Sequence, residues 1–364
     1  MKRITVGIAG TAKNTGKTTT TRVLLEHFQN RGVRLGITSI GYDGEKVDNI
    51  TGLPKPRIFL NKGDFAAVAE KCLGVSSARM KIIARTDINT PLGRIVCGEV
   101  MKEGLMVVAG PNQSVHLRSI RQWMYGQETG LVIVDGALNR IAPMVETDGF
   151  ILATGAAHTV DLDRLAFETH CIGVICNHPG VYAIPHPGRE SGNTIVWDGN
   201  GQVLAKLPAF LFDPGDLGPF LEVMAKARCF FCPGVISGAC LNYMWDLGFA
   251  EGTSFVFEDP VKLLLSDVTS AHRFIEKVFM KGGSVGYIRA LPLIAVTVNP
   301  FYPSCRYGTH SYQEDYVDRD LLLGKIKSAV EVPVFDVVSQ GPEELAALLE
   351  RYALSIENDV CINI

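Results

Sequence analysis

A glycine-containing segment near the N-terminus has residue types suited to binding phosphate. Residues 3–9 form a short β-rich apolar run, and apolar residues recur at helical spacing from Thr20 to Gln29. In a strand–loop–helix order, the N–H groups of the loop and of the helix N-terminus point toward one spot and favour an anion. We therefore expect a triphosphate-binding loop, called here the glycine loop, made of Gly10, Thr11, Ala12, Lys13, Asn14, Thr15, Gly16, Lys17, Thr18 and Thr19.

Two side chains of the glycine loop suit a nucleoside triphosphate and its metal. Lys17 is expected to reach the β- and γ-phosphates, and the Thr18 hydroxyl to ligate Mg²⁺. In the empty protein we expect Lys17 to be a solvated loop residue. The usual pattern has four residues between its glycines and starts at position 11, where this chain has Thr11, with Gly10 one residue earlier. Lys13 stands four residues before Lys17 and is either a phosphate contact or a solvated lysine.

Carboxylates follow two further predicted strands. Residues 131–134 are apolar and lead into Asp135, which we expect to hold a magnesium-bound water or to orient the attacking water. The alternative is an aspartate that caps the turn at Gly136. Residues 33–40 lead in the same way toward Asp43 and Glu45. Either of these meets the metal or a nucleophile, or is a plain turn residue. The predicted catalytic set is Lys17, Asp135 and Asp43, with Thr18 and Asp135 as metal ligands.

Strands and helices alternate along the chain, which favours an α/β fold with a mostly parallel, doubly wound sheet and a second, smaller α/β domain. We predict a nucleotide-binding domain over 1–177, a connecting segment rich in Gly, Pro and His with a β-hairpin over 178–227, and the second domain over 228–364. The expected strands are 3–9, 33–40, 81–85, 105–109, 131–134, 149–153, 172–176, 229–236, 254–257, 293–298 and 332–338, with strand or helix at 92–101. The expected helices are 17–31, 64–73, 113–126, 159–170, 261–281, 319–330 and 342–353.

Three motifs outside the glycine loop have a structural as well as a functional interpretation. Cys229 and Cys232 have metal or redox spacing, but no second pair follows, so buried cysteines in a strand are favoured. Asn299-Pro300 ends a predicted strand and is interpreted as simple turn chemistry, the alternative being a contact with a ligand or the other domain. Arg94 follows a Thr-Pro-Leu-Gly turn and is interpreted as an ordinary surface arginine rather than a phosphate or substrate contact.

The charge balance, the apolar runs and the cysteines of the sequence argue against several classes of protein. The 364 residues include 35 Lys and Arg and 38 Asp and Glu, which gives a net charge of −3. This balance argues against a protein that coats nucleic acid, and no apolar run approaches the length of a membrane span. The first apolar run is too short for a signal peptide, so we expect a cytoplasmic protein. Nine scattered cysteines favour reduced thiols over a disulfide framework.

The glycine loop also carries family resemblances. Gly10-Thr11 followed by Gly16-Lys17-Thr18 resembles the loop of the dethiobiotin synthetase family, although Asp135-Gly136 stands where that family has Glu-Gly. A wider set of strings resembles the reactivase subunit of lysine 5,6-aminomutase: Lys13-Asn-Thr-Gly-Lys-Thr-Thr19, Thr90-Pro-Leu-Gly93, Ala109-Gly-Pro111, Val134-Asp-Gly-Ala137, Ile151-Leu-Ala-Thr-Gly-Ala156, Thr297-Val-Asn-Pro300 and Val332-Pro-Val-Phe-Asp-Val337. The resemblance implies an ATP-consuming factor that expels damaged cobalamin from a B12- and pyridoxal-phosphate-dependent aminomutase. It also implies a second ATPase subunit as partner.

Three functions remain open at this point. The first is a nucleotide-hydrolysing reactivation factor with ATP and Mg²⁺ as cofactors. The second is an ATP-dependent ligase or small-molecule kinase of the dethiobiotin synthetase type. The third is a scaffold that binds nucleotide without hydrolysing it. No Asn-Lys-x-Asp string is present, so ATP is preferred to GTP.

Overall fold

The computed structural model describes residues 2–41, 58–177, 192–305 and 312–362 and divides the chain into two compact units. The first unit consists of residues 1–166 and 293–364, and the second of residues 167–292. The second unit is thus an insertion in the first, and the chain leaves the first unit within helix α4 (Leu162–Cys176) and returns before residue 293.

The first unit is built on a nine-stranded mixed sheet. From β18 to β4 all neighbouring strands are parallel, and β6 and β5 extend the sheet as an antiparallel edge. Most of the parallel strands are buried along their whole length, as expected for strands covered on both faces. In spatial order the strands are β18 (Val334–Phe335), β15 (Leu293–Asn299), β9 (Gly149–Gly155), β1 (Ile4–Gly10), β8 (Leu131–Ala137), β2 (Leu35–Ser39), β4 (Phe65–Ala69), β6 (Gly93–Lys102) and β5 (Arg79–Thr90).

Helices cover both faces of this sheet. Side chains alternate along a strand, so Thr5 and Gly7 lie on one face of β1 and Val6 and Ile8 on the other. The first face packs against α3 (Ser114–Gly126) and the 3₁₀ turn η2 (Ala142–Glu146), where Met144 fills the space left by Gly7. The opposite face packs against α1 (Lys17–Asn30), which also contacts α10 (Glu343–Ile362). The sheet is therefore doubly wound, as predicted.

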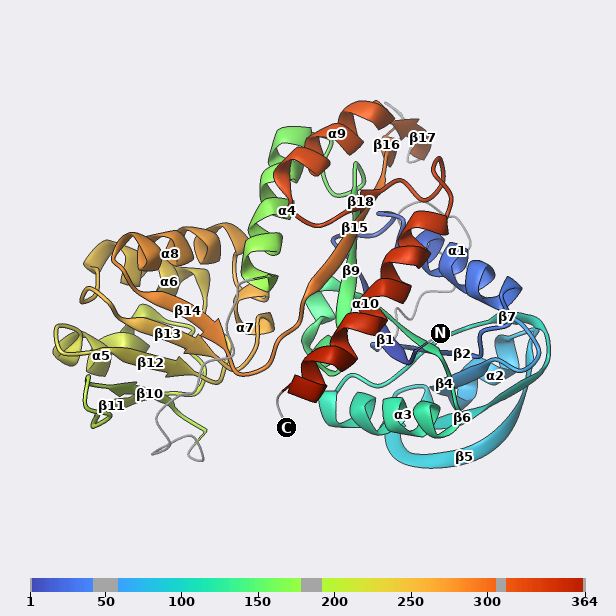
Figure 1. Ribbon diagram of the computed structural model, residues 1–364, viewed down its shortest axis with the longest axis horizontal. Coiled ribbons are helices and arrows are strands. Elements are labelled where there is room, and N and C mark those ends of the chain that lie inside the picture. Colours follow the sequence, from blue (N-terminus) through green and yellow to red (C-terminus); the bar gives the residue numbers. More distant parts are fainter. Residues whose placement is uncertain (1, 42–57, 178–191, 306–311, 363–364) are drawn as a thin grey trace. The chain divides into compact units, whose positions relative to one another are not determined.

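Smaller elements complete the first unit. β3 (Ile58–Leu60) pairs with β7 (Gly104–Met106), and β16 (Phe301–Cys305) with β17 (Tyr312–Tyr316), both antiparallel. The hairpin β16–β17 directly follows β15, which runs beside β9 in Figure 1. The remaining elements are α2 (Glu70–Val75), the 3₁₀ turn η1 (Leu138–Arg140) and α9 (Arg319–Ala329).

The second unit has its own five-stranded sheet, in the order β11 (Val203–Leu207), β10 (Thr194–Trp197), β12 (Cys229–Cys232), β13 (Ser254–Phe257) and β14 (Ser284–Tyr287). β12, β13 and β14 are parallel, and β10 and β11 form an antiparallel hairpin at the edge. The packed rings of Phe220, Phe230, Phe249, Phe255 and Phe274 form an apolar core. The helices are α5 (Gly218–Val223), α6 (Gly238–Leu247), α7 (Val261–Leu264) and α8 (Val268–Met280).

The division into units differs from the predicted domains. Residues 293–364 were expected in the second domain, but β15 pairs with β9 in the first sheet. The hairpin β10–β11 was expected in a connecting segment, but it belongs to the second sheet. Both differences have one reason, because strand pairing between distant segments leaves no periodic signal in the sequence. The β/α alternation is the same whichever sheet a strand joins.

Several element predictions are also wrong. The helix expected at 64–73 is strand β4 followed by the short helix α2, because the fully buried run Phe65–Ala69 has no alternation to distinguish it from a helix. The β-branched run at 172–176 continues helix α4 instead of forming a strand. The strand expected at 332–338 is only Val334–Phe335, and the helix expected at 261–281 is broken between α7 and α8. The strand expected at 81–85 is the centre of the longer edge strand β5.

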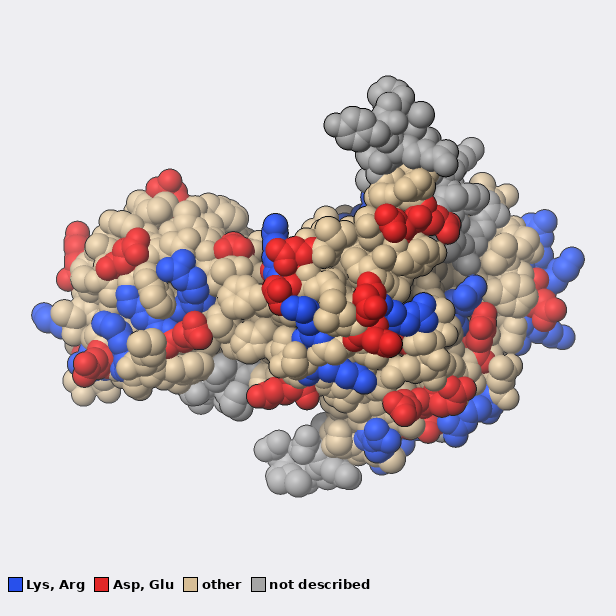
Figure 2. Space-filling model, turned by 90° about the horizontal axis from the view of Figure 1, so that it is seen from above, with Lys and Arg blue, Asp and Glu red and all other residues tan. Residues whose placement is uncertain are grey.

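The charged side chains are mixed on the surface. On the face drawn in Figure 2, Lys and Arg lie among Asp and Glu, in keeping with the near-neutral net charge. In the parts of the chain that the structure describes, no helix combines the length and apolar character needed to cross a bilayer.

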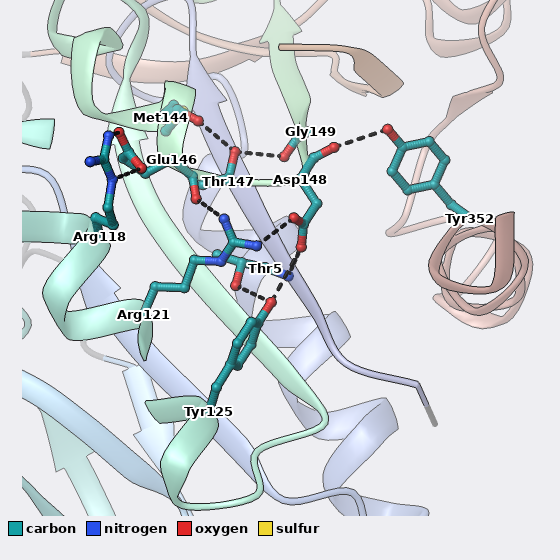
Figure 3. Close-up of polar contacts among 10 residues, drawn as sticks. All are labelled: Thr5, Arg118, Arg121, Tyr125, Met144, Glu146, Thr147, Asp148, Gly149 and Tyr352. Carbon is teal, nitrogen blue, oxygen red and sulfur yellow. Dashed lines mark hydrogen bonds and ion pairs between the residues drawn. The ribbon is translucent and has the colours of Figure 1, made fainter. Parts of the chain in front are cut away.

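A polar network closes the amino-terminal end of β1 and β9 (Figure 3). Asp148 accepts hydrogen bonds from Thr5 N at 2.8 Å and Arg121 Nη2 at 2.8 Å, and its main-chain oxygen accepts one from the Tyr352 hydroxyl at 2.9 Å. Arg118 donates two hydrogen bonds to the buried Glu146 carboxylate. These contacts connect α3 and α10 to the end of the sheet opposite the glycine loop, so the network has a structural role.

Candidate functional site

The glycine loop leaves the carboxyl-terminal end of β1 and leads into α1, as predicted. Thr11 N donates to Ala153 O of the neighbouring β9 at 3.1 Å, and the Thr11 hydroxyl lies 3.1 Å from the Thr154 hydroxyl. Within the loop the Thr15 hydroxyl donates to Ala12 O at 3.0 Å. The end of β9 therefore fixes the start of the loop, and a side-chain hydrogen bond closes the turn.

The backbone of the loop is held in an unusual conformation. Asn14 has φ of 64° and Gly16 has φ of 90°, both in the left-handed region that most residues avoid. A Cβ placed on Gly10 would lie 3.1 Å from Thr15 Oγ1, so Gly10 permits the tight approach of the loop to its own start. Gly16 is the N-cap of α1, and no side chain caps this helix. The first-turn N–H groups, which lack acceptors inside the helix, are thus not capped by a side chain.

The structure brings the predicted Lys17 and Asp135 together. Lys17 Nζ lies 3.4 Å from Asp135 Oδ1, and both side chains are only about one-fifth exposed. Asp135 lies in register with Ile8 of β1 and Ser39 of β2, so the parallel pairing places it beside the glycine loop. Thr18 follows in the first turn of α1 and is half-buried, whereas Lys13 is exposed. The expectation of a solvated Lys17 is wrong because the carboxylate at the end of β8 holds the ammonium group.

Other predicted residues do not join this group. Asp43 and Glu45 lie outside the described residues. Arg94 is exposed on β6, where it pairs with Asn89 of the edge strand β5, and this agrees with a surface arginine.

Two residues at this end of the sheet were not predicted as site residues. Asn299, interpreted from the sequence as a turn residue, donates through Nδ2 to Asn14 O at 2.8 Å. Arg140 lies in η1, just beyond β8, with Nη1 3.8 Å from the position of a Cβ on Gly41. The position of each after a predicted apolar strand was a usable signal, since ligands of α/β sheets bind at the carboxyl ends of strands.

This arrangement suits a polyphosphate and a divalent cation. No side chain caps the N-terminus of α1, and Asn14 and Gly16 of the preceding loop have positive φ. Loop N–H groups in such a conformation, together with the positive end of a helix dipole, favour an anion bound at the helix N-terminus. The chain supplies one ammonium group at Lys17, one hydroxyl at Thr18 and one carboxylate at Asp135. Hydroxyl and carboxylate oxygens are hard ligands of the kind that Mg²⁺ prefers, and Mg²⁺ commonly takes one or two protein ligands with phosphate and water.

The cysteines of the second unit occupy structural positions. Cys229 and Cys232 lie on the single strand β12, Cys229 half-buried and Cys232 fully buried. Burial raises the pKa of each thiol to about 11, so neither is a ready thiolate. Within the described residues, no group of three or more His, Cys, Asp or Glu side chains is placed to hold a metal ion.

Comparison with known proteins adds no assignment. No protein-family model, curated protein or solved structure matches the chain.

Proposed function

We propose that this protein is a Mg²⁺-dependent ATPase whose nucleotide site is the glycine loop. One observation carries the proposal: Lys17 and Asp135 meet at the carboxyl ends of β1 and β8. The N-terminus of α1 lies at the same place, where Gly16 has positive φ and no side chain caps the helix.

Each residue has a definable task in this reaction. The loop N–H groups bind phosphate oxygens, and Lys17 exchanges Asp135 for the β- and γ-phosphates. Thr18 would supply one oxygen ligand to Mg²⁺, and Asp135, released from Lys17, would accept a hydrogen bond from a water that the metal holds or orient the attacking water. When bound, Mg²⁺ would neutralise the negative charge that develops on the phosphate oxygens. The Lys17–Asp135 pair is therefore the contact that nucleotide binding must open.

The resemblance to aminomutase reactivase subunits supports a role for this ATPase in reactivating a cobalamin- and pyridoxal-phosphate-dependent aminomutase, together with a second ATPase subunit. In such a factor, loss of the γ-phosphate changes the conformation of the loops that bind a partner protein.

The test measures thermal stability and ATP turnover of the full chain. Mg-ATP is expected to raise the melting temperature, and hydrolysis is expected to be slow alone and faster with an aminomutase complex. Turnover that requires a small molecule instead indicates the ligase or kinase, and binding without turnover under any condition indicates the scaffold. A chain that Mg-ATP, Mg-ADP and Mg-GTP all fail to stabilise contradicts the proposal.

A further inference from the structure

Asn299 connects three parts of the first unit at the edge of the glycine loop. Its side-chain Nδ2 donates to Asn14 O at 2.8 Å, across 285 positions in the sequence. Its main-chain oxygen accepts a hydrogen bond from Ala156 N at 3.0 Å, just beyond β9. Its Oδ1 accepts a longer hydrogen bond of 3.3 Å from Phe301 N, the first residue of the hairpin β16–β17.

Asn299 packs tightly against two glycines, Gly155 and Gly16. A Cβ on Gly155 would lie 2.0 Å from Asn299 O, so only glycine permits this approach of β9 to β15. A Cβ on Gly16 would lie 3.1 Å from Asn299 Cβ, so the side chain also packs directly against the N-cap of α1. Asn299 is half-buried and followed by the buried Pro300. Turn chemistry alone requires none of these contacts with the glycine loop.

The hydrogen bond to Asn14 O has a consequence for the loop amides. The C=O of Asn14 and the N–H of Thr15 belong to one planar trans peptide and point in opposite directions. An Asn299 donor that holds the carbonyl therefore fixes the direction of the next N–H. Asn14 has positive φ, which is costly outside glycine, and a specific hydrogen bond offsets part of that cost.

We propose that Asn299 is a positioning residue of the glycine loop and couples the state of the loop to the hairpin β16–β17. The inference rests on the proposed function, since it assigns to Asn299 the task of keeping the loop ready for a triphosphate. Phosphate binding restricts the peptide between Asn14 and Thr15. The Asn14–Asn299 hydrogen bond then restricts the Asn299 side chain. The hydrogen bond from Phe301 N to that side chain in turn restricts the start of the hairpin.

The hairpin carries exposed aromatic side chains close to its backbone contact with Asn299. Tyr312 and Tyr316 of β17 are 42% and 55% exposed, and Glu314 lies between them. The ring of Phe301 packs edge to face on Tyr316 at a centroid distance of 5.8 Å. Phe301 thus receives the contact from Asn299 through its backbone and supports an exposed tyrosine through its side chain.

The experiment uses the isosteric variant Asn299→Asp in the full chain. Aspartate keeps the acceptor for Phe301 N but places an oxygen against Asn14 O, where the donor was. Asn89→Asp is the matched control, because Asn89 is exposed on the edge strand β5 and its Nδ2 donates to Asp87 O of the same strand at 3.4 Å. Mg-ATP affinity is measured by calorimetry, and backbone exchange of residues 301–305 and 312–316 by hydrogen–deuterium exchange.

For Asn299→Asp we expect at least about a tenfold weaker Mg-ATP affinity, equal to about 1.4 kcal/mol. The melting temperature without nucleotide is expected to fall by a few degrees, because Asn14 loses the hydrogen bond that offsets its positive φ. Affinity and exchange are therefore measured well below that temperature, where the variant is folded. Mg-ATP should slow exchange in both hairpin strands of the unaltered chain and of Asn89→Asp but not of Asn299→Asp. Affinity within twofold of the unaltered chain, or equal protection of the hairpin in both, overturns the inference alone. An unaltered chain that binds no Mg-ATP overturns the proposed function and the inference together.

Discussion

Lys17 Nζ and Asp135 Oδ1 lie 3.4 Å apart, although 118 positions separate the two residues in the sequence. The pair exists because β1 and β8 are parallel neighbours, so the loop after one strand meets the carboxylate at the end of the other. A charged pair that is mostly removed from water holds both groups in place before any ligand arrives. The same two groups are the ones that a triphosphate and its metal would separate.

Replacing Lys17 removes the ammonium group that lies 3.4 Å from Asp135 Oδ1. For Lys17→Ala we expect Mg-ATP affinity to fall about 100-fold, or about 2.7 kcal/mol, because the phosphates lose their ammonium partner. The far-ultraviolet circular dichroism should not change. Calorimetric titration checks the affinity, and Lys62→Ala, an exposed lysine of the same unit, is the control. Equal affinity of Lys17→Ala and the unaltered chain would show that the site lies elsewhere.

Asp135→Asn separates the metal from the phosphate contribution. The amide keeps the size of the side chain but loses the charge that favours a cation, so we expect Mg²⁺ to strengthen ATP binding much less than in the unaltered chain. ATP turnover should fall at least about 100-fold, as for the loss of a water-orienting group. The measurement is a set of ATP titrations at fixed Mg²⁺ concentrations. A Mg²⁺ dependence that stays the same in the variant contradicts the assignment of Asp135.

The sequence was sufficient for the local structure of the site and insufficient for its surroundings. Strand 3–9, the glycine loop and the helix from Lys17 follow one another, so local patterns predicted them well. The strand before Asp135 was equally clear, because four apolar residues precede the carboxylate. The contact of Asn299 with the glycine loop was missed, since its partner Asn14 is 285 positions away and strand order decides whether the two meet. A buried run such as Phe65–Ala69 was ambiguous for another reason: periodicity cannot separate a buried strand from a helix.

The membership of β15 in the first unit has a direct test. Thr20 of α1 and Thr297 of β15 are buried, and their hydroxyls lie 2.9 Å apart. Thr20→Val or Thr297→Val leaves one buried hydroxyl without this partner, which is expected to cost about 1–3 kcal/mol of unfolding free energy. The double variant should cost less than the sum of the two, because valine has nearly the same shape and no polar group remains. Urea denaturation gives the four values, and strict additivity would mean that the hydroxyls do not interact.

The thiols of β12 are expected to be unreactive in the folded protein. Burial raises the pKa of Cys229 and of Cys232 to about 11, well above the ordinary value of a cysteine thiol. At pH 8 the thiolate fraction of each is therefore far lower than for an ordinary cysteine. Iodoacetamide followed by peptide mass spectrometry should label these two sites in urea but hardly at all in native buffer. Rapid native labelling, or a Cys229–Cys232 disulfide under mild oxidation, would support a redox role instead.

The polar network around Asp148 should affect stability and leave nucleotide binding unchanged. Asp148→Asn keeps an acceptor for Thr5 N but removes the charge that pairs with Arg121, at 2.8 Å and largely buried. Because the Arg121 guanidinium then lacks its carboxylate, we expect a loss of about 1–3 kcal/mol in unfolding free energy. The network closes the amino-terminal end of β1, whereas the glycine loop leaves the carboxyl-terminal end, so Mg-ATP affinity should stay within about twofold. Urea denaturation and calorimetry on the same sample separate the two effects. Asp135→Asn is the comparison variant for the other end of the sheet and is expected to lose Mg²⁺ dependence. An Asp148→Asn variant that lost Mg-ATP affinity as well as stability would contradict this division of roles between the two ends of the sheet.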